Sequence, residues 1–290
     1  MTSGDTSSMR FSSDAVGLEV GPVAHAIDAR WLMAYAAGLG ETDPASYDTR
    51  RVEGPRAHPL FPVCYEWPLA LQVRQRLVSA ELELRSVHAQ HDLTIHRAPR
   101  AGDALSTRAR VVAIVQRKPG AFMMVRYETV DATGERVTTT EYGSLYRGVA
   151  VDGPEQCPPG WAPDPPAAST DLPVVSTVRV PATLAHVYTE CAQIWNPIHT
   201  DVAVAERVGL PGIILHGTAT LALTVSQVLA ALGRDPEQVG RIACRFTGMV
   251  LMPSTLTVRA RSLERDVVRF EALGADGATV VSRGILQLHS

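Results

Sequence analysis

The sequence predicts an α+β protein made of two units, in each of which an antiparallel sheet wraps around one helix. Two observations predict this fold. A proline-rich segment at 151–173 divides the 290-residue chain into halves of similar size, and its composition is typical of a semi-extended linker. Each half also contains a long helical pattern that is followed by segments of alternating apolar and polar residues. We therefore predict domains at 1–150 and 174–290.

In the first half, the helix is predicted at 66–82, where apolar residues recur at helical spacing and Pro68 falls in the first turn. Turn residues punctuate the sequence that follows, as expected between paired strands. The strand-like segments lie at 91–97, 110–116, 121–131 and 137–148. This half is therefore expected to fold as a helix followed by an antiparallel sheet.

The second half repeats this order. Its helix is predicted at 216–233 and is mostly apolar, with Gly233 placed to end it. Because such a helix must be covered on most sides, a twisted sheet that curls around it is the expected partner. The strand-like segments lie at 241–250, 254–264, 267–275 and 278–289. Joining the edges of the two sheets would protect both from aggregation, so we predict a pseudo-dimer.

Composition excludes several classes of function. A net charge of −3 and a pI near 6.3 argue against a nucleic-acid partner, because phosphate binding relies on clustered Lys and Arg. The amino terminus lacks the apolar core of a secretory signal, and no segment is apolar enough to span a membrane. The cysteines are widely spaced and predict neither a zinc site nor a disulfide framework. We expect a cytoplasmic protein.

A motif in the second half carries the chemistry. The stretch QIWNPIHTD at 193–201 places an Asn-Pro break just before His199, and ILHG follows at 214–217. With Ala205 and Gly209 between them, these pieces resemble the hydratase motif of the MaoC-like family of hot-dog proteins, which includes the (R)-specific enoyl-CoA hydratases. In the first half, WLMAYAAGLGETDP and AHPLFPVCYEW are similar to the degenerate amino-terminal hot dog of two-domain members.

The resemblance implies a double hot-dog fold and a reversible hydratase or dehydratase. Its substrate would be a 2-enoyl or 3-hydroxyacyl thioester carried by CoA or by a carrier protein. The first half, which has no such motif, would form a tunnel for the acyl chain. CoA would enter as part of the substrate, and no other cofactor is expected. A homodimer is plausible for such folds.

The reaction needs a base for water, a proton source for the α-carbon and a donor for the enolate oxygen. His199 can serve the first two roles near neutral pH, and Asn196 can orient it or the water. The N–H of Gly217 has no intrahelical partner at the start of the apolar helix and can bind the thioester oxygen. His216 is expected to cap or pack, with direct substrate contact as the alternative.

One departure from the family pattern leaves the mechanism open. Family hydratases carry Gly-Asp where this chain has Gln193 and Ile194, so the usual aspartate is missing. His199 could work without a partner in a syn reaction, or Glu190 or Asp201 could substitute. The pocket could also bind an acyl thioester and perform different chemistry or none. A hot-dog thioesterase would need a carboxylate on or near a central helix, and 217–233 contains none.

Three histidines in the first half raise the question of a metal site. His88, His91 and His96 lie close together in sequence. Strand alternation would place His88 on the opposite face from His91, and no carboxylate or cysteine cluster completes a site. We therefore predict ordinary strand positions and no metal.

Overall fold

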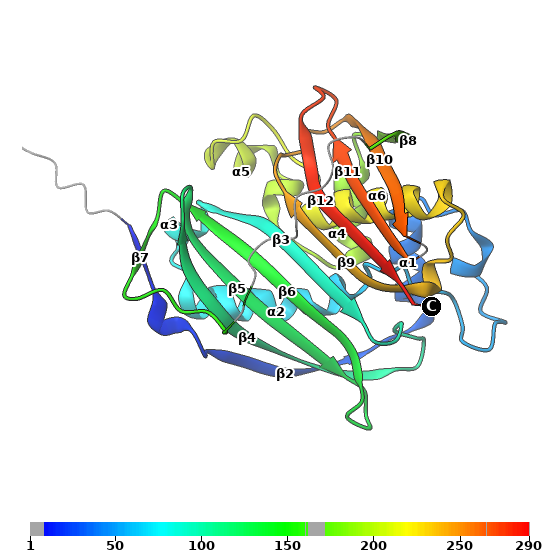
Figure 1. Cartoon of the computed structure of the whole chain (residues 1–290), viewed down its shortest axis with the longest axis horizontal. Helices are drawn as coiled ribbons and strands as arrows, with labels where there is room; N and C mark the ends of the chain where they lie inside the picture. The colour runs from blue at the N-terminus through cyan, green and yellow to red at the C-terminus, as the bar shows by residue number, and fades with distance from the viewer. Residues whose placement is uncertain (1–8, 160, 162–171, 265, 290) are drawn as a thin grey trace, which may run out of the picture.

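A computed structural model describes residues 9–159, 161, 172–264 and 266–289. Ten strands form one continuous sheet in the order β2-β4-β5-β6-β3-β9-β12-β11-β10-β8 (Figure 1). The first five of these strands belong to the first half of the chain and the last five to the second half. β3 and β9 join the halves as antiparallel neighbours, with His91 opposite Cys244. The predicted α+β pseudo-dimer, joined through its sheet edges, is confirmed.

The elements of the first half follow the predicted order, with additional short elements near the amino terminus. Two short strands, β1 (Arg10–Ser12) and β7 (Ala150–Asp152), pair separately and in parallel. The other elements are β2 (Glu19–Ala26), α1 (Ala29–Gly38), α2 (Pro62–Leu77), α3 (Ala80–Glu83), β3 (Ser86–Ile95), β4 (Ala104–Arg117), β5 (Gly120–Val130) and β6 (Arg136–Arg147), with 3-10 turns η1 (Ser13–Ala15) and η2 (Pro44–Ser46).

The second half has a similar layout. It begins with an edge strand and a short helix before the motif region. Its elements are β8 (Val174–Val180), α4 (Leu184–Ala192), η3 (Pro197–His199), α5 (Val202–Arg207), α6 (Gly217–Ala231), η4 (Pro236–Gln238), β9 (Val239–Phe246), β10 (Ser254–Glu264), β11 (Val267–Leu273) and β12 (Thr279–Leu288).

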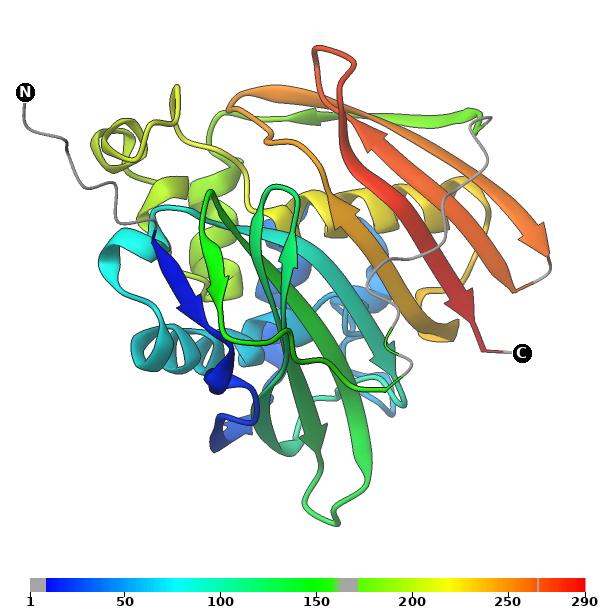
Figure 2. The same cartoon turned by 60° about the vertical axis from the view of Figure 1, so that its left-hand side comes forward.

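The two central helices are α2 and α6, and each lies along one side of its half of the sheet (Figures 1 and 2). α6 begins at Gly217, and Gly233 has the positive φ of a terminating residue, as predicted. α2 starts at Pro62, earlier than predicted, because Pro62 occupies the first turn, where a missing N–H costs nothing. Pro68 consequently lies inside the helix, where the buried packing of its neighbours compensates for the lost hydrogen bond.

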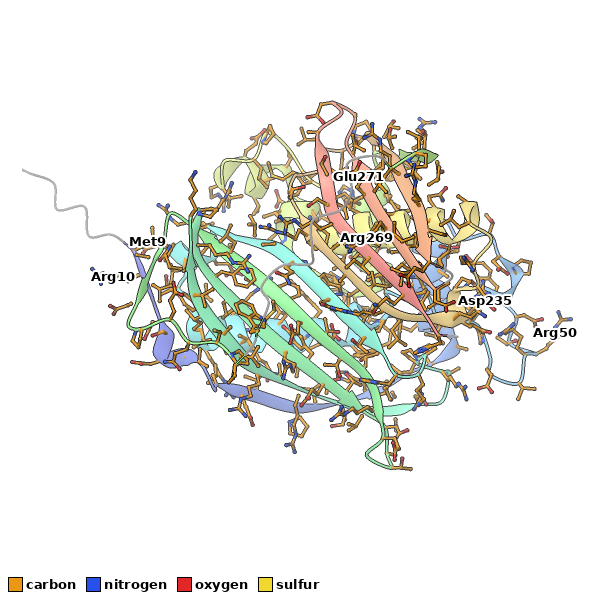
Figure 3. The ribbon with its side chains drawn as sticks, viewed as in Figure 1. Met9, Arg10, Arg50, Asp235, Arg269 and Glu271 are labelled. Atoms are coloured by element: carbon orange, nitrogen blue, oxygen red, sulfur yellow. The ribbon has the colours of Figure 1, made fainter. Side chains whose placement is uncertain are left out.

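One apolar core runs through both halves. Leu69 of α2 and Val225 of α6 are fully buried in the same cluster of side chains. Strand residues alternate between this core and the opposite face. In β11, Phe270 is buried, whereas Arg269 and Glu271 lie on the other side of the sheet (Figure 3).

Helices α1 and α4 form a second contact between the halves. A Cβ atom on Gly38 of α1 would lie only 2.8 Å from the Cβ of Cys191 in α4, so a glycine is needed where the helices meet. The hydroxyls of Tyr35 and Tyr188 lie 3.4 Å apart in the same interface. This contact fixes the end of α4, from which the motif loop departs.

The predicted linker at 151–173 is described only in part, since residues 160 and 162–171 lie outside the described residues. The described part begins within β7, and Gln156 forms a bridge with Ile114 of β4. The domain limits at 150 and 174 therefore stay predictions. In the described part of the chain, no helix is both long and apolar enough to cross a membrane.

Candidate active site

His199 stands at the end of a short 3-10 turn that the Asn-Pro break creates. Asn196 is extended and caps the turn, with its Oδ1 accepting the N–H of Ile198 at 3.4 Å, and Pro197 occupies the first position. The His199 Nδ1–H donates to the carbonyl oxygen of Ile214 at 2.8 Å. Because that carbonyl can only accept, the ring must carry its proton on Nδ1. Nε2 is left as an unprotonated nitrogen, which is the form that a general base requires.

Burial keeps this imidazole neutral. His199 is 8% exposed, and desolvation lowers its pKa to about 4, with a smaller contribution from the positive charge of Arg74. The hydrogen bond to Ile214 acts in the opposite direction but is the weaker influence. Near neutral pH the ring is therefore a base that is ready to accept a proton.

The start of α6 lies directly beside this ring. His216 is the residue that precedes the helix, and its ring stacks on that of His199 with centroids 3.6 Å apart. Gly217, the first helical residue, has an N–H without an intrahelical acceptor. Its φ is not positive, and an added Cβ would meet only the ring of Phe246, at 3.4 Å. The backbone conformation therefore does not require glycine here, but a ligand that approaches the N–H closely would.

His216 is held in place by the loop that departs from α4. Its Nε2–H donates to the carbonyl oxygen of Ile194 at 3.3 Å and lies 3.2 Å from the hydroxyl oxygen of Thr189. The side chain is 2% exposed and its Nδ1 has no partner within the described residues. This position fits a packing role that supports the His199 ring. Direct contact of His216 with substrate stays a prediction.

The two carboxylates considered as substitutes for the missing aspartate lie elsewhere. Glu190 is exposed on α4, and α4 ends at Ala192, before Ile194, because Gln193 adopts a left-handed conformation. If the helix had continued, Glu190 would share a face with Ile194, four residues later, but the helix stops before it can. Asp201 is exposed and caps α5, accepting the N–H groups of Ala203 and Val204. Neither carboxylate contacts His199.

Asn196 does not orient His199 through its side chain. Its amide oxygen is engaged by Ile198, and it contacts His199 only through its backbone carbonyl, which accepts the His199 N–H at 3.1 Å. The imidazole is instead oriented by Ile214, a residue whose role no side-chain pattern could reveal. Asn196 shapes the turn that carries His199.

Two histidines of the first half also approach this region, contrary to expectation. A β-bulge between His88 and Gln90 interrupts strand alternation. It brings His88 and His91 onto one face, with ring centroids 5.5 Å apart, so the prediction of opposite faces was wrong. The ring of His88 lies 4.5 Å from that of Phe246, which borders Gly217. Even so, the described residues contain no cluster of three or more His, Cys, Asp or Glu that could hold a metal.

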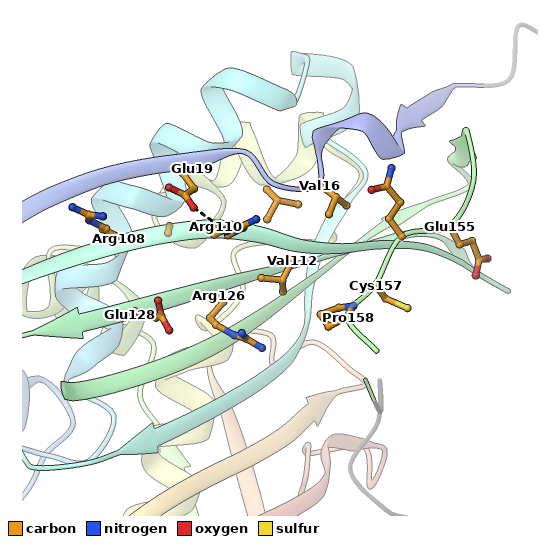
Figure 4. Close-up of a pocket in the computed structure, with 13 residues that line it drawn as sticks. Val16, Glu19, Arg108, Arg110, Val112, Arg126, Glu128, Glu155, Cys157 and Pro158 are labelled. Carbon is orange, nitrogen blue, oxygen red and sulfur yellow. Dashed lines mark hydrogen bonds and ion pairs between the residues drawn. The ribbon is translucent and has the colours of Figure 1, made fainter. Parts of the chain in front are cut away.

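A separate groove lies on the outer side of the first-half sheet, where the segment 155–158 crosses β4 (Figure 4). Arg108, Arg110 and Arg126 line it together with carboxylates such as Glu19 and Glu128. The charges are of both signs, and none of the predicted site residues lines this groove. This groove is therefore separate from the predicted site residues, which lie near the start of α6.

Comparisons with known proteins agree with this geometry. The MaoC like domain matches residues 169–282, and the FAS1-like, dehydratase domain region matches residues 14–140. The resemblance of the second half to the MaoC-like family is confirmed. Each half thus matches a separate dehydratase-type domain, and the half that carries His199 and Gly217 is the MaoC-like one.

Two curated relatives of this chain come from Mycobacterium tuberculosis. Enoyl-CoA hydratase ChsH3 is 26% identical over 92% of this chain and 95% of its own length. 3-hydroxyacyl-thioester dehydratase X is 27% identical over 59% of this chain and 57% of its own length. Other relatives are much longer, and the chain spans 4% of a fungal fatty acid synthase subunit beta and 41% of a fly peroxisomal multifunctional enzyme type 2.

Solved structures confirm the MaoC-like architecture. A MaoC-like dehydratase from Phytophthora capsici superposes with a TM-score of 0.85 at 21% identity, covering 96% of this chain and 98% of that one. The predicted double hot-dog fold is confirmed.

Proposed function

We propose that the protein is a hydratase or dehydratase that interconverts a 2-enoyl thioester and a 3-hydroxyacyl thioester, carried by CoA or by a carrier protein. One observation carries the proposal. The stack of His199 on His216 places an unprotonated imidazole beside the start of α6, where Gly217 offers a free N–H. A base and an oxyanion donor therefore lie within the same small region.

Hydration would proceed through an enolate. Nε2 of His199 takes a proton from water, and the water oxygen bonds to the β-carbon while the double-bond electrons move to the thioester oxygen. The N–H of Gly217 stabilises the negative charge on that oxygen. His199 then returns the proton to the α-carbon, which restores the thioester. Since one imidazole performs both transfers, water adds to a single face of the double bond.

This mechanism needs no carboxylate beside His199. Ile194 is 5% exposed and packs in the core, and its carbonyl serves His216. With Glu190 and Asp201 both on the surface, the single-base alternative is the one that the geometry supports. The relatives named enoyl-CoA hydratase and 3-hydroxyacyl-thioester dehydratase support the same class of reaction. A cytoplasmic location and a homodimer stay predictions.

A test with defined substrates separates the three functions. We expect crotonyl-CoA or a longer 2-enoyl-CoA to lose its enoyl absorbance when incubated with the protein. Release of free thiol without hydration would indicate a thioesterase, and binding without turnover would indicate a non-catalytic binding protein. Either result would overturn the proposal.

His199→Ala tests the assignment of the base. We expect kcat/KM to fall by roughly 100- to 10,000-fold, the usual contribution of a general base. His96→Ala is the matched control, because His96 is exposed and bonds only to Thr139. Undiminished hydration by the His199 variant would remove the imidazole from the mechanism.

A further inference from the structure

A line of side chains leads from the active site into the first half of the molecule. The ring of Phe246 borders Gly217, and the ring of His88 follows at 4.5 Å. Tyr142 of β6 stacks on His88 with centroids 3.7 Å apart. Nη2 of Arg74, in α2, donates to the Tyr142 hydroxyl at 3.3 Å. The line runs between α2 and the sheet, where the resemblance places the acyl chain.

These side chains lie deep in the protein but retain accessible surface. Burial lowers the pKa of His88 well below its usual range and raises the pKa of Tyr142. Even so, His88, Tyr142, Phe246 and Gly217 are all only partly buried. Deep residues that keep accessible surface are those expected to line an internal space. Residues with these properties extend from Gly217 toward Arg74.

Within the described residues, Arg74 has only one anionic partner, and that partner is distant. The carboxylate of Glu83 lies 3.9 Å from Nη1 and is 54% exposed, whereas the Arg74 side chain is 17% exposed. Glu66 is the buried carboxyl of the same helix, but burial raises its pKa to about 8, so it is mostly neutral at pH 7. Among the described residues the guanidinium makes one hydrogen bond, to Tyr142, and one long ion pair, to Glu83, so most of its five N–H donors are available to a ligand.

Other donors nearby also lack acceptors. Arg74 lies over the ring of Trp67, 5.0 Å from its centroid, and the buried Trp67 Nε1–H has no partner in the part of the chain that the structure describes. Both ring nitrogens of His91 are likewise buried without partners within the described residues, and the His91 ring lies 6.4 Å from that of Tyr142. A purely hydrocarbon chain would leave all these groups unpaired, which is costly.

We propose that the acyl chain of the substrate carries a carboxylate at the end remote from the thioester, and that Arg74 and Tyr142 bind it. This inference rests on the hydratase function proposed above. A carboxylate would accept two hydrogen bonds from the guanidinium and supply the missing countercharge. The phosphates of CoA are a second source of the same anionic chemistry, and the experiment separates the two.

The test compares Arg74→Met with the native protein on 2-enoyl-CoAs that end in a methyl or a carboxylate group, over a series of chain lengths. We expect the native protein to prefer the carboxylated series. In the variant, kcat/KM for that series should fall roughly 10- to 100-fold, the effect of losing a hydrogen-bonded charge. The methyl series should be unaffected. Arg76→Met is the matched control, because Arg76 is exposed on the same helix.

Two results would overturn the inference. Equal losses on both series would show that Arg74 supports the fold or the thioester in general. Losses on every CoA thioester but none on the matching pantetheine thioesters, which lack the nucleotide phosphates, would assign Arg74 to CoA.

A binding measurement keeps this test independent of catalysis. Calorimetric titration with saturated acyl-CoAs of both series requires no turnover. Weaker binding of the carboxylated ligand by Arg74→Met would support the inference even if no enoyl-CoA is hydrated. Equal affinity of the native protein for both ligands, in the absence of turnover, would contradict it.

Discussion

The protonation state of His199 is set by two residues of the ILHG stretch whose roles the motif does not reveal. The carbonyl of Ile214 fixes the proton on Nδ1, and the ring of His216 covers one face of the imidazole. Burial of the ring lowers its pKa to about 4, against the weaker opposite effect of the hydrogen bond to Ile214. His199 is thus a weak base, but it is fully available at neutral pH.

The pH dependence of hydration follows from this pKa. His199 must be neutral to take a proton from water, and its neutral fraction falls only as the pH falls through about 4. We expect kcat/KM for a 2-enoyl-CoA to stay level from pH 8 to pH 6 and to decline as the pH approaches 4. A pH-rate profile measures this directly. A decline that begins near 6.5, the pKa of an unperturbed histidine, would contradict the buried geometry.

The absence of a side chain at Gly217 is expected to matter for the ligand and not for the fold. An added Cβ would make an ordinary contact with Phe246 at 3.4 Å, and alanine favours a helix more than glycine does. We expect Gly217→Ala to retain its melting temperature and to lose on the order of 100-fold in kcat/KM, because a methyl group would keep the thioester oxygen from the N–H.

Gly212→Ala is the control for that variant. Gly212 lies upstream of α6, and a Cβ there would meet nothing within 4 Å. Its activity and stability should therefore match those of the native protein. A Gly217 variant that is fully active would remove this amide from the mechanism.

At this scale, the sequence predicted where His199 and Gly217 lie, because the Asn-Pro break and the helix start can be read from neighbouring residues. Their catalytic roles were implied by the family resemblance and stay predictions. Arg74, His88 and Tyr142 were missed as a group because they come from separate elements. Strand alternation placed His88 on the wrong face, since a bulge leaves no reliable trace in a single sequence.

Among the elements, the segment from α4 to α5 determines how the site is held. α4 packs on α1 and ends at Gln193, whose left-handed backbone turns the chain toward Asn196. Asn196 and Asp201 then cap η3 and α5 in succession. The side chains of Asn196 and Asp201 therefore stabilise turns in the chain. His199 is the polar side chain of the motif that remains available for catalysis.

The capping role of Asp201 gives a test of this division of labour. We expect Asp201→Ala to lower the free energy of unfolding by about 1 kcal/mol, the usual cost of losing a helix cap. Its kcat/KM should change little. Glu190→Gln should alter neither quantity, because Glu190 is exposed. Urea unfolding and steady-state kinetics measure both effects. Loss of activity in the Glu190 variant would restore the substitute-base hypothesis.

The order of the elements was predictable from sequence because periodicity and turn residues are local signals. The helix at α6 and its ending at Gly233 were predicted closely. The start of α2 was predicted too late, because both Pro62 and Pro68 are suited to the first turn of a helix. The structure begins the helix at Pro62, and Pro68 lies inside it among buried neighbours. The joining of the two sheets was predicted from the need to cover sheet edges. The strands that join, β3 and β9, were not predicted, because no residue pattern identifies them.

Over the whole molecule, the two halves share a fold but differ in what they bury. The second half surrounds α6 with apolar side chains and presents its chemistry at the start of that helix. The first half buries Glu66 in α2, hydrogen-bonded to Thr140 at 2.5 Å. The first half thus lacks the catalytic motif but buries a polar pair, Glu66 and Thr140, beside its central helix. A polar interior of this kind is consistent with a role in selecting the substrate.

Buried neutral histidines make the stability of the whole protein sensitive to acid. Burial lowers the pKa of His91 and of His199 to about 4, and it lowers the pKa of His88 and of His216 well below the usual value. When the chain unfolds, these rings return to about 6.5. Between pH 6.5 and 4 the unfolded state therefore binds more protons, and the free energy of unfolding falls as the pH falls.

We expect urea unfolding to show this loss as a steep decrease in stability from pH 7 to pH 4.5, with each buried ring contributing up to about 1.4 kcal/mol per pH unit. Glu66 acts in the opposite direction: its folded pKa of about 8 favours the folded state as the pH falls from 8 to 4.5. Glu66→Gln should therefore steepen the acid loss and raise stability above pH 8. A stability that is flat between pH 7 and 4.5 in both proteins would show that the four rings are not buried as neutral bases.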